Sequence, residues 1–110
     1  QVPLGLTLYL LGGWSYVLWG IFLRLVLVYH VTWLVNSATH AWGTRAYDTE
    51  DSSRNNKWVA ALTFGEGWHN NHHAYPSSAK QGLQRGQIDL TWYHIVLLKR
   101  LRLATNVRIF

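Results

Sequence analysis

The N-terminal part of the chain is dominated by apolar side chains. Residues 2–11 form one apolar run that ends at Gly12 and Gly13, and residues 14–35 form a second in which Arg24 is the only charged residue. A helix needs about 20 apolar residues to cross a bilayer. Residues 1–11 are therefore predicted to be the end of a transmembrane helix, the two glycines a turn at the membrane surface, and the second run a spanning helix. Arg24 is unfavourable there unless it snorkels or pairs.

The spanning helix is predicted to continue beyond the membrane, over residues 14–40. The aromatic residues Trp14 and Trp19 near its start are typical of a membrane interface. At 1.5 Å per residue the helix would be about 40 Å long, which exceeds a hydrocarbon core of about 30 Å. Asn36 and His40 are therefore expected just outside the membrane.

Residues 41–110 have a mixed polar and apolar pattern and predict a cytoplasmic helical region. Residues 43–57 are rich in charged side chains and predict a loop, which is followed by a short apolar run and a histidine-rich helix. Pro76 should end that helix. Residues 89–103 are amphipathic with a basic end, and are expected on the membrane surface or on the flank of this region. The predicted fold class is an all-α membrane protein with truncated transmembrane helices and a cytoplasmic helical cap.

Three of the six histidines lie within five residues, at the end of the segment Gly65-Glu66-Gly67-Trp68-His69-Asn70-Asn71-His72-His73. On a helix, the spacing places His69 on one face with both His72 and His73. Imidazole is the commonest side-chain ligand of transition metals. Because His72 and His73 would point about 100° apart, they could serve two neighbouring ions. A dinuclear centre is the hypothesis, and a surface histidine cluster or a single zinc site is the alternative.

A second polar element lies at the end of the predicted spanning helix. Thr32, Asn36 and His40 are spaced i, i+4, i+8 and form one helical stripe. Asn36 and His40 add two donors to the three clustered histidines. Since the chain has no cysteine and only five carboxylates, imidazole dominates the donor set, which suits iron, copper or zinc better than calcium or magnesium.

These two motifs resemble the C-terminal part of membrane fatty-acyl desaturases. The matching segments are the histidine-rich segment above, Asn36-Ser37-Ala38-Thr39-His40, Arg45-Ala46-Tyr47-Asp48 and Arg54-Asn55-Asn56. The resemblance covers almost the whole chain and is to the Δ9 (stearoyl-type) branch, especially the acyl-lipid forms of cyanobacteria, other bacteria and plastids. It implies a C-terminal fragment, because the family also has an HxxxxH box and a first HxxHH box upstream.

The resemblance also implies roles for individual residues. The direct iron ligands would be His40, His69, His72 and His73. Asn36 would hold its iron through a water. Thr32 and Trp33 would contact the substrate where the family's acyl tunnel bends near the irons, although Trp33 could instead be a membrane-interface anchor.

The implied activity is the insertion of a cis double bond, expected at Δ9, into a saturated acyl chain with two iron ions, O2 and two electrons. The substrate would be a fatty-acyl lipid or acyl-CoA, and the electron donor ferredoxin or cytochrome b5. Zinc could replace iron in an overexpressed protein. The alternatives are a membrane diiron fatty-acid hydroxylase or alkane oxidiser, and a non-catalytic membrane protein with structural zinc. The fragment alone is expected to be inactive.

The distribution of charge predicts orientation and partners. Nine of the ten Lys and Arg residues follow His40, whereas the predicted glycine turn carries none. The two apolar runs predict a multi-pass membrane protein. The positive-inside rule then places its metal site on the cytoplasmic face. The basic residues behind the net charge of +5 are scattered, which favours anionic lipid headgroups over nucleic acid; no nucleic-acid partner is expected.

Residues beside the histidines are expected to have supporting roles. Glu66 and Asn70 would orient ligating imidazoles or cap a helix or loop. Gly65 and Gly67 would let the backbone turn before the histidine helix. His30 is expected to pack or to form a hydrogen bond, and His94 to face the solvent.

Overall fold

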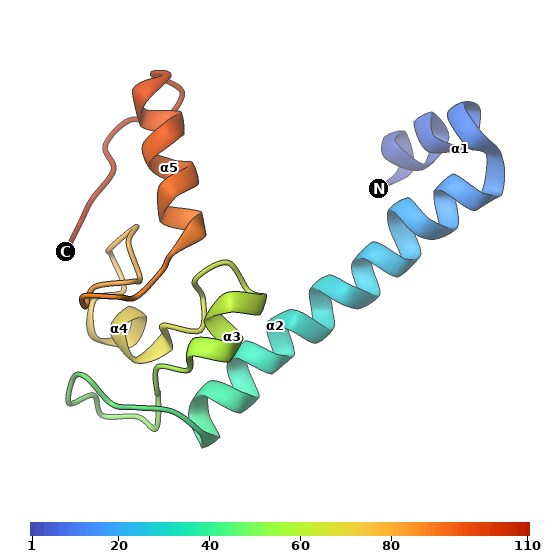
Figure 1. Cartoon of the computed structure of the whole chain (residues 1–110). Helices are drawn as coiled ribbons and strands as arrows, with labels where there is room; N and C mark the ends of the chain where they lie inside the picture. The colour runs from blue at the N-terminus through green and yellow to red at the C-terminus, as the bar shows by residue number, and fades with distance from the viewer. The chain divides into compact units, whose positions relative to one another are not determined.

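The computed structural model describes residues 1–110, which form helices joined by loops (Figure 1). The helical elements are α1 (Val2–Val17), the π-helical segment η1 (Leu18–Leu23), α2 (Arg24–Ala41), α3 (Lys57–Leu62), α4 (His69–Ala74) and α5 (Leu90–Arg100). Thr44 and Trp68 each form an isolated β-bridge to Asn55. The all-α prediction is confirmed. The chain divides into two compact units, residues 1–33 and 34–110.

A sharp turn at Gly12 and Gly13 divides the first unit. Both residues have non-helical backbone angles, and Gly13 has φ 65° and ψ −157°, a combination that is readily available only to glycine. After this turn the chain reverses direction (Figure 1), and the start of α1 packs against η1. The turn predicted from the two glycines is therefore present.

Small residues allow the two arms of this hairpin to approach closely. A Cβ atom on Gly20 would lie 2.7 Å from Leu8 Cδ1, and one on Gly5 would lie 3.2 Å from Ile21 Cδ1. Glycines at such contacts are typical of helix pairs in membranes, where close van der Waals packing drives association. A side chain at Gly20 would therefore require Leu8 to move, whereas one at Gly5 would displace the flexible end of Ile21 by only a few tenths of an ångström.

Arg24 has partners within the same unit. Its Nε donates to the Gly20 carbonyl oxygen and its Nη2 to Gln1 Oε1, both at 3.0 Å. Judged by length and composition alone, Val2–Ala41 is the one helical stretch that could cross a membrane. The apolar stretch therefore contains an arginine that is paired through hydrogen bonds, as its position required.

In the second unit, the segment before α4 is clamped onto α3. Asn56 caps α3, since its Oδ1 accepts hydrogen bonds from the backbone of residues 58 and 59. The Asn56 N–H donates to the Gly67 carbonyl oxygen, and the Gly67 N–H donates to Thr63 Oγ1. Gly65 has φ 125°, which favours glycine. Both glycines thus make the turn that was predicted before the histidine helix.

The other predicted boundaries are also found. Helix α4 ends at Ala74, two residues before Pro76. Within residues 89–103, α5 begins after Asp89, which caps it by accepting a hydrogen bond from the Trp92 N–H at 2.8 Å. The π-helical geometry of η1 was not predicted.

We expect Gly67→Ala to destabilise the second unit strongly. The new Cβ would lie 2.0 Å from the Ala60 backbone nitrogen and 2.6 Å from the Asn56 carbonyl oxygen, neither of which can move without distorting α3. The free energy of unfolding should fall by about 3 kcal/mol, at the upper end of ordinary overpacking. Thermal unfolding of the purified protein measures this change. Gly5→Ala is the control, because its new Cβ meets only the flexible end of Ile21; equal losses in both variants would contradict the prediction.

Candidate metal centre

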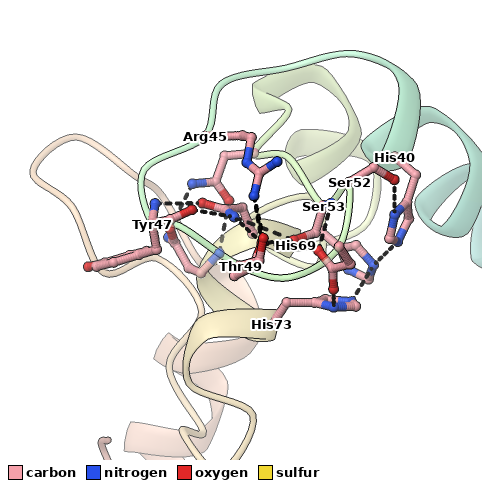
Figure 2. A network of polar contacts seen from close by, with 12 residues as sticks. His40, Arg45, Tyr47, Thr49, Ser52, Ser53, His69 and His73 are labelled. Atoms are coloured by element: carbon pink, nitrogen blue, oxygen red, sulfur yellow. Dashed lines mark hydrogen bonds and ion pairs between the residues drawn. The ribbon is translucent and has the colours of Figure 1, made fainter.

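Three imidazole rings from two helices meet in the second unit. His40 comes from the end of α2, and His69 and His73 come from α4. The Nε2 atoms of His40 and His69 are 3.2 Å apart, and those of His69 and His73 are 3.0 Å apart. Figure 2 shows the three rings turned toward one another. Each ring offers one ligand atom, and these three atoms lie within 4.8 Å of one another.

The outer nitrogens of two of these rings face a loop. His73 Nδ1 donates a hydrogen bond to Asp51 Oδ2, and His40 Nδ1 lies 3.1 Å from Ser52 Oγ (Figure 2). Hydrogen bonding by one ring nitrogen sets the orientation of an imidazole and the role of the other nitrogen. When the proton of neutral His73 is on Nδ1, its Nε2 presents a lone pair to the centre of the cluster.

The converging nitrogen atoms fit a metal cation. His69 Nε2 has two neighbouring nitrogens but can carry only one proton, so it cannot donate properly to both His40 and His73. A cation at this position would instead accept the lone pairs of all three rings. An all-imidazole donor set suits iron, copper or zinc.

Asp51 is held as an anion by its own loop. Its Oδ1 accepts hydrogen bonds from the Ser53 N–H at 2.8 Å and from Thr49 Oγ1 at 3.1 Å. Hydrogen bonding by Ser53, from its side chain first and then from its backbone N–H, keeps the pKa of the Asp51 carboxyl well below its usual range, and Thr49 and His73 add to this effect. A carboxylate is therefore available to His73 at neutral pH.

Burial keeps the central imidazole neutral. His69 is buried, and this desolvation, followed by the neighbouring His73, His40 and His72, lowers the pKa of His69 to about 4. Burial also lowers the pKa of His72. Both rings are thus uncharged at neutral pH, which is the form that binds metals.

Asn70 shapes the loop that contacts the histidines. It is fully buried, and its Oδ1 accepts hydrogen bonds from the Ala46 and Tyr47 N–H groups, both at 2.8 Å. Its Nδ2 donates to the Tyr47 carbonyl oxygen at 3.0 Å and to Thr49 Oγ1 at 3.2 Å. Two roles were predicted for Asn70: orienting the imidazoles, or capping a helix or loop. The structure favours the first, because Asn70 holds the loop that contacts His40 and His73. Glu66 is exposed.

Asn71 fixes the other side of α4. Its Oδ1 accepts a hydrogen bond from Asn55 Nδ2 at 2.6 Å, and its Nδ2 donates to the Gln81 carbonyl oxygen and to Gln87 Oε1, both at 2.7 Å. Like Asn70, it is fully buried with the donor and the acceptor of its amide both paired. The sequence did not predict this role or those of Asp51 and Ser52. The two adjacent asparagines inside the histidine segment were a usable signal, whereas nothing separated Asp51 from the other acidic residues of its loop.

His72 lies outside the three-histidine cluster. Its ring centroid is 6.1 Å from that of His69 and 5.7 Å from that of His73. The Nδ1 atom of His72 is buried and has no hydrogen-bond partner. A buried polar atom without a partner is unfavourable, so this nitrogen is suited to a ligand such as a second metal ion.

The remaining predicted site residues lie on α2. Asn36 is exposed, four residues before His40. Thr32 and Trp33 belong to the first unit, where Thr32 Oγ1 donates to the Val28 carbonyl oxygen at 2.9 Å and Trp33 stacks on Tyr29 with 6.3 Å between ring centroids. The ligand role of Asn36 and the substrate roles of Thr32 and Trp33 stay predictions.

We expect Asp51→Asn to weaken metal retention by about 10-fold to 100-fold, the usual effect of losing a partner that orients a ligating histidine. The metal content of the protein, measured after dialysis against graded chelator concentrations, tests this. Asp48→Asn is the matched control, because Asp48 is fully exposed and pairs only with Arg45. Equal retention by the two variants would rule out a role for Asp51.

The chelator-treated protein should lose stability as the pH falls from about 6.5 to about 4. His69 has a pKa of about 4 when folded and near 6.5 when unfolded, so in this window the unfolded chain binds the extra proton. The loss should begin near the upper value and be complete below the lower one. Urea unfolding at a series of pH values measures it. In His69→Gln this slope should be smaller, and an unchanged slope would assign it to other groups.

The comparisons with known proteins give one family. The fatty acid desaturase model matches residues 2–105. The sn-1 stearoyl-lipid 9-desaturase of Anabaena variabilis is 61% identical over 99% of this chain and 40% of its own length, and that of Synechocystis is 59% identical over 99% and 34%. The chloroplastic palmitoyl-monogalactosyldiacylglycerol delta-7 desaturase of Arabidopsis thaliana is 55% identical over 98% and 29%. The chain therefore spans two fifths or less of these relatives, and it belongs to the fatty acid desaturase family.

Proposed function

We propose that the parent protein of this chain is a fatty-acyl desaturase that introduces a cis double bond, at Δ9, into a saturated acyl chain. The convergence of His40, His69 and His73 carries the proposal, because it provides a nitrogen-rich site of the kind that redox metals bind. Membership of the desaturase family supports the reaction type. Two relatives that are about 60% identical, both stearoyl-lipid 9-desaturases, support the position of the double bond.

Two iron ions would be the resident cofactor. The Nε2 atoms of His40, His69 and His73 would bind one ion, and His72, with its unpartnered Nδ1, would bind the other. Asn36 would add a water-mediated contact. Zinc could occupy the same nitrogen atoms in an overexpressed protein, since imidazole also suits zinc.

When bound, iron would supply the oxidising chemistry. Two hydrogens leave adjacent methylene carbons, and these two hydrogens, together with two electrons and two protons, reduce O2 to two waters. The chain's own residues would prepare the site. Asp51 and Ser52 would orient the rings of His73 and His40, and the buried amide of Asn70 would hold their loop in place. Such orientation matters because small displacements of a reacting group reduce rates sharply.

The substrate is proposed to be the acyl chain of a membrane lipid. The two stearoyl-lipid desaturases above are more similar to this chain than the icosanoyl-CoA 5-desaturase of Limnanthes douglasii, which is 50% identical. Acyl-CoA is the alternative substrate. Thr32 and Trp33, on the apolar part of α2, would contact the acyl chain.

The protein is proposed to be a multi-pass membrane protein with its metal site on the cytoplasmic face. The apolar stretch Val2–Ala41 and the concentration of basic residues after His40 support this orientation. The electrons would come from ferredoxin or cytochrome b5.

Fatty-acid analysis of a host that lacks its own desaturase and expresses the parent protein tests the function. We expect a new cis-Δ9 monoene, which should fall by at least about 100-fold in His72→Ala if that ring binds metal, because metal-site residues act as a unit. Asp48→Ala should leave the product unchanged. A hydroxylated acid would instead identify a hydroxylase. A metal-containing protein that causes no lipid change would favour structural zinc.

A further inference from the structure

Helix α5 presents an uncovered apolar stripe. Leu90, Tyr93, Leu97 and Leu101 are 47%, 57%, 51% and 58% exposed. They are spaced three or four residues apart, which places them on one side of the helix. No residue of α5 is buried. Scattered exposed leucines are normal on a protein surface, but a continuous stripe indicates an interaction site.

The stripe continues into an apolar hollow at the start of the helix. The hollow is lined by Phe64, Leu90, Thr91, His94 and Ile95, and has a volume of about 400 Å³. Phe64 is exposed and has φ 58°, an unfavourable angle for an aromatic residue. The Thr91 N–H donates to the Phe64 carbonyl oxygen at 2.9 Å, so this aromatic side chain is held beside the first turn of α5.

The charged residues of α5 and of the segment that follows it are all positive. Residues 90–110 contain Lys99, Arg100, Arg102 and Arg108, and no acidic residue. The ion pairs in the structure involve none of these four cations. An apolar stripe with an unneutralised basic end matches an anionic surface that also offers apolar contact.

The stripe belongs to a helix that is fixed to its unit. Asp89 is 2% exposed, and its Oδ2 accepts hydrogen bonds from the Gln81 N–H at 2.7 Å and the Gly82 N–H at 3.0 Å, while its Oδ1 caps α5. Gly65 packs so closely on Asp89 that a Cβ would lie 2.5 Å from Oδ1. Binding therefore requires little ordering of this helix, which favours affinity.

We propose that the α5 face binds the anionic headgroup surface of a lipid bilayer. This face consists of the apolar side chains of Phe64, Leu90, Tyr93, Leu97 and Leu101, and it ends at the basic cluster Lys99, Arg100 and Arg102 of the last helical turn and the residues after it. The apolar side chains enter the boundary between headgroups and acyl chains, and the three cations contact lipid phosphates. An acidic protein is the less suitable occupant, because energetically dominant residues in protein interfaces are enriched in Trp, Tyr and Arg and poor in Leu, whereas three of the four stripe residues are leucines.

The test uses the full parent protein in nanodiscs, with an environment-sensitive fluorophore on Leu97→Cys in a background without other reactive cysteines. Neutral phosphatidylcholine discs are compared with discs containing phosphatidylglycerol, and lipid-borne spin labels report contact with the bilayer. We expect quenching in anionic discs. In K99Q/R100Q/R102Q the ratio of docked to undocked protein should fall roughly fivefold per removed charge.

Two controls separate docking from general effects. K57Q/K80Q/R85Q removes the same charge outside the α5 face and should leave the quenching unchanged, and a fluorophore on Gln84→Cys should stay in water. Residue 97 could be shielded from water to the same extent in anionic discs, in neutral discs and in the charge variant. That result would mean that protein, not lipid, covers the face, and it would overturn the proposal. The proposal would also be overturned if residue 97 stayed exposed to water in anionic discs and became shielded only after an acidic electron-donor protein was added.

Discussion

Buried amide hydrogen bonds hold together a unit that has very little apolar core. Its buried hydrophobic residues are Val35, Ala38, Val59 and Ala60, whereas its most deeply buried large side chains include those of Asn70 and Asn71. A buried amide is unfavourable unless its donors and acceptors are paired, and a fully paired network is specific and rigid. Because the partners of these two amides come from segments on both sides of α4, the loops around the histidines have one arrangement that satisfies the network.

The positions of the histidines in the metal centre depend on this hydrogen-bond network. Helix α4 has only six residues, and a helix so short has little stability of its own. It is held instead by the clamp between Gly67 and α3, and by the side chains of Asn70 and Asn71. Asn70 helps to hold the loop from which Asp51 and Ser52 reach the outer nitrogens of His73 and His40. The ligands and the groups that orient them are therefore parts of one hydrogen-bonded structure.

The sequence predicted those features that depend on local chemistry. Gly12 and Gly13 marked a turn because of their conformational freedom, and the spacing of His69 and His73 placed both rings on one face of a helix. It did not predict the position of Asp51 beside His73, because that contact follows from a bond between Asn70 and the backbone of residues 46 and 47, more than 20 residues away in sequence. The π-helical segment η1 was missed for a different reason: apolar periodicity does not distinguish it from an α-helix over so few residues.

The composition of the second unit's interior also bears on its thermodynamics. The heat capacity increase on unfolding comes from newly exposed apolar surface and is reduced by newly exposed polar surface. A unit whose deepest side chains are amides and hydroxyls, such as Asn70, Asn71, Thr39 and Ser53, has a smaller increase than an aliphatic core of equal size. The curve of its free energy of unfolding against temperature is therefore flatter, so cooling weakens this unit less than it would weaken an aliphatic core of equal size.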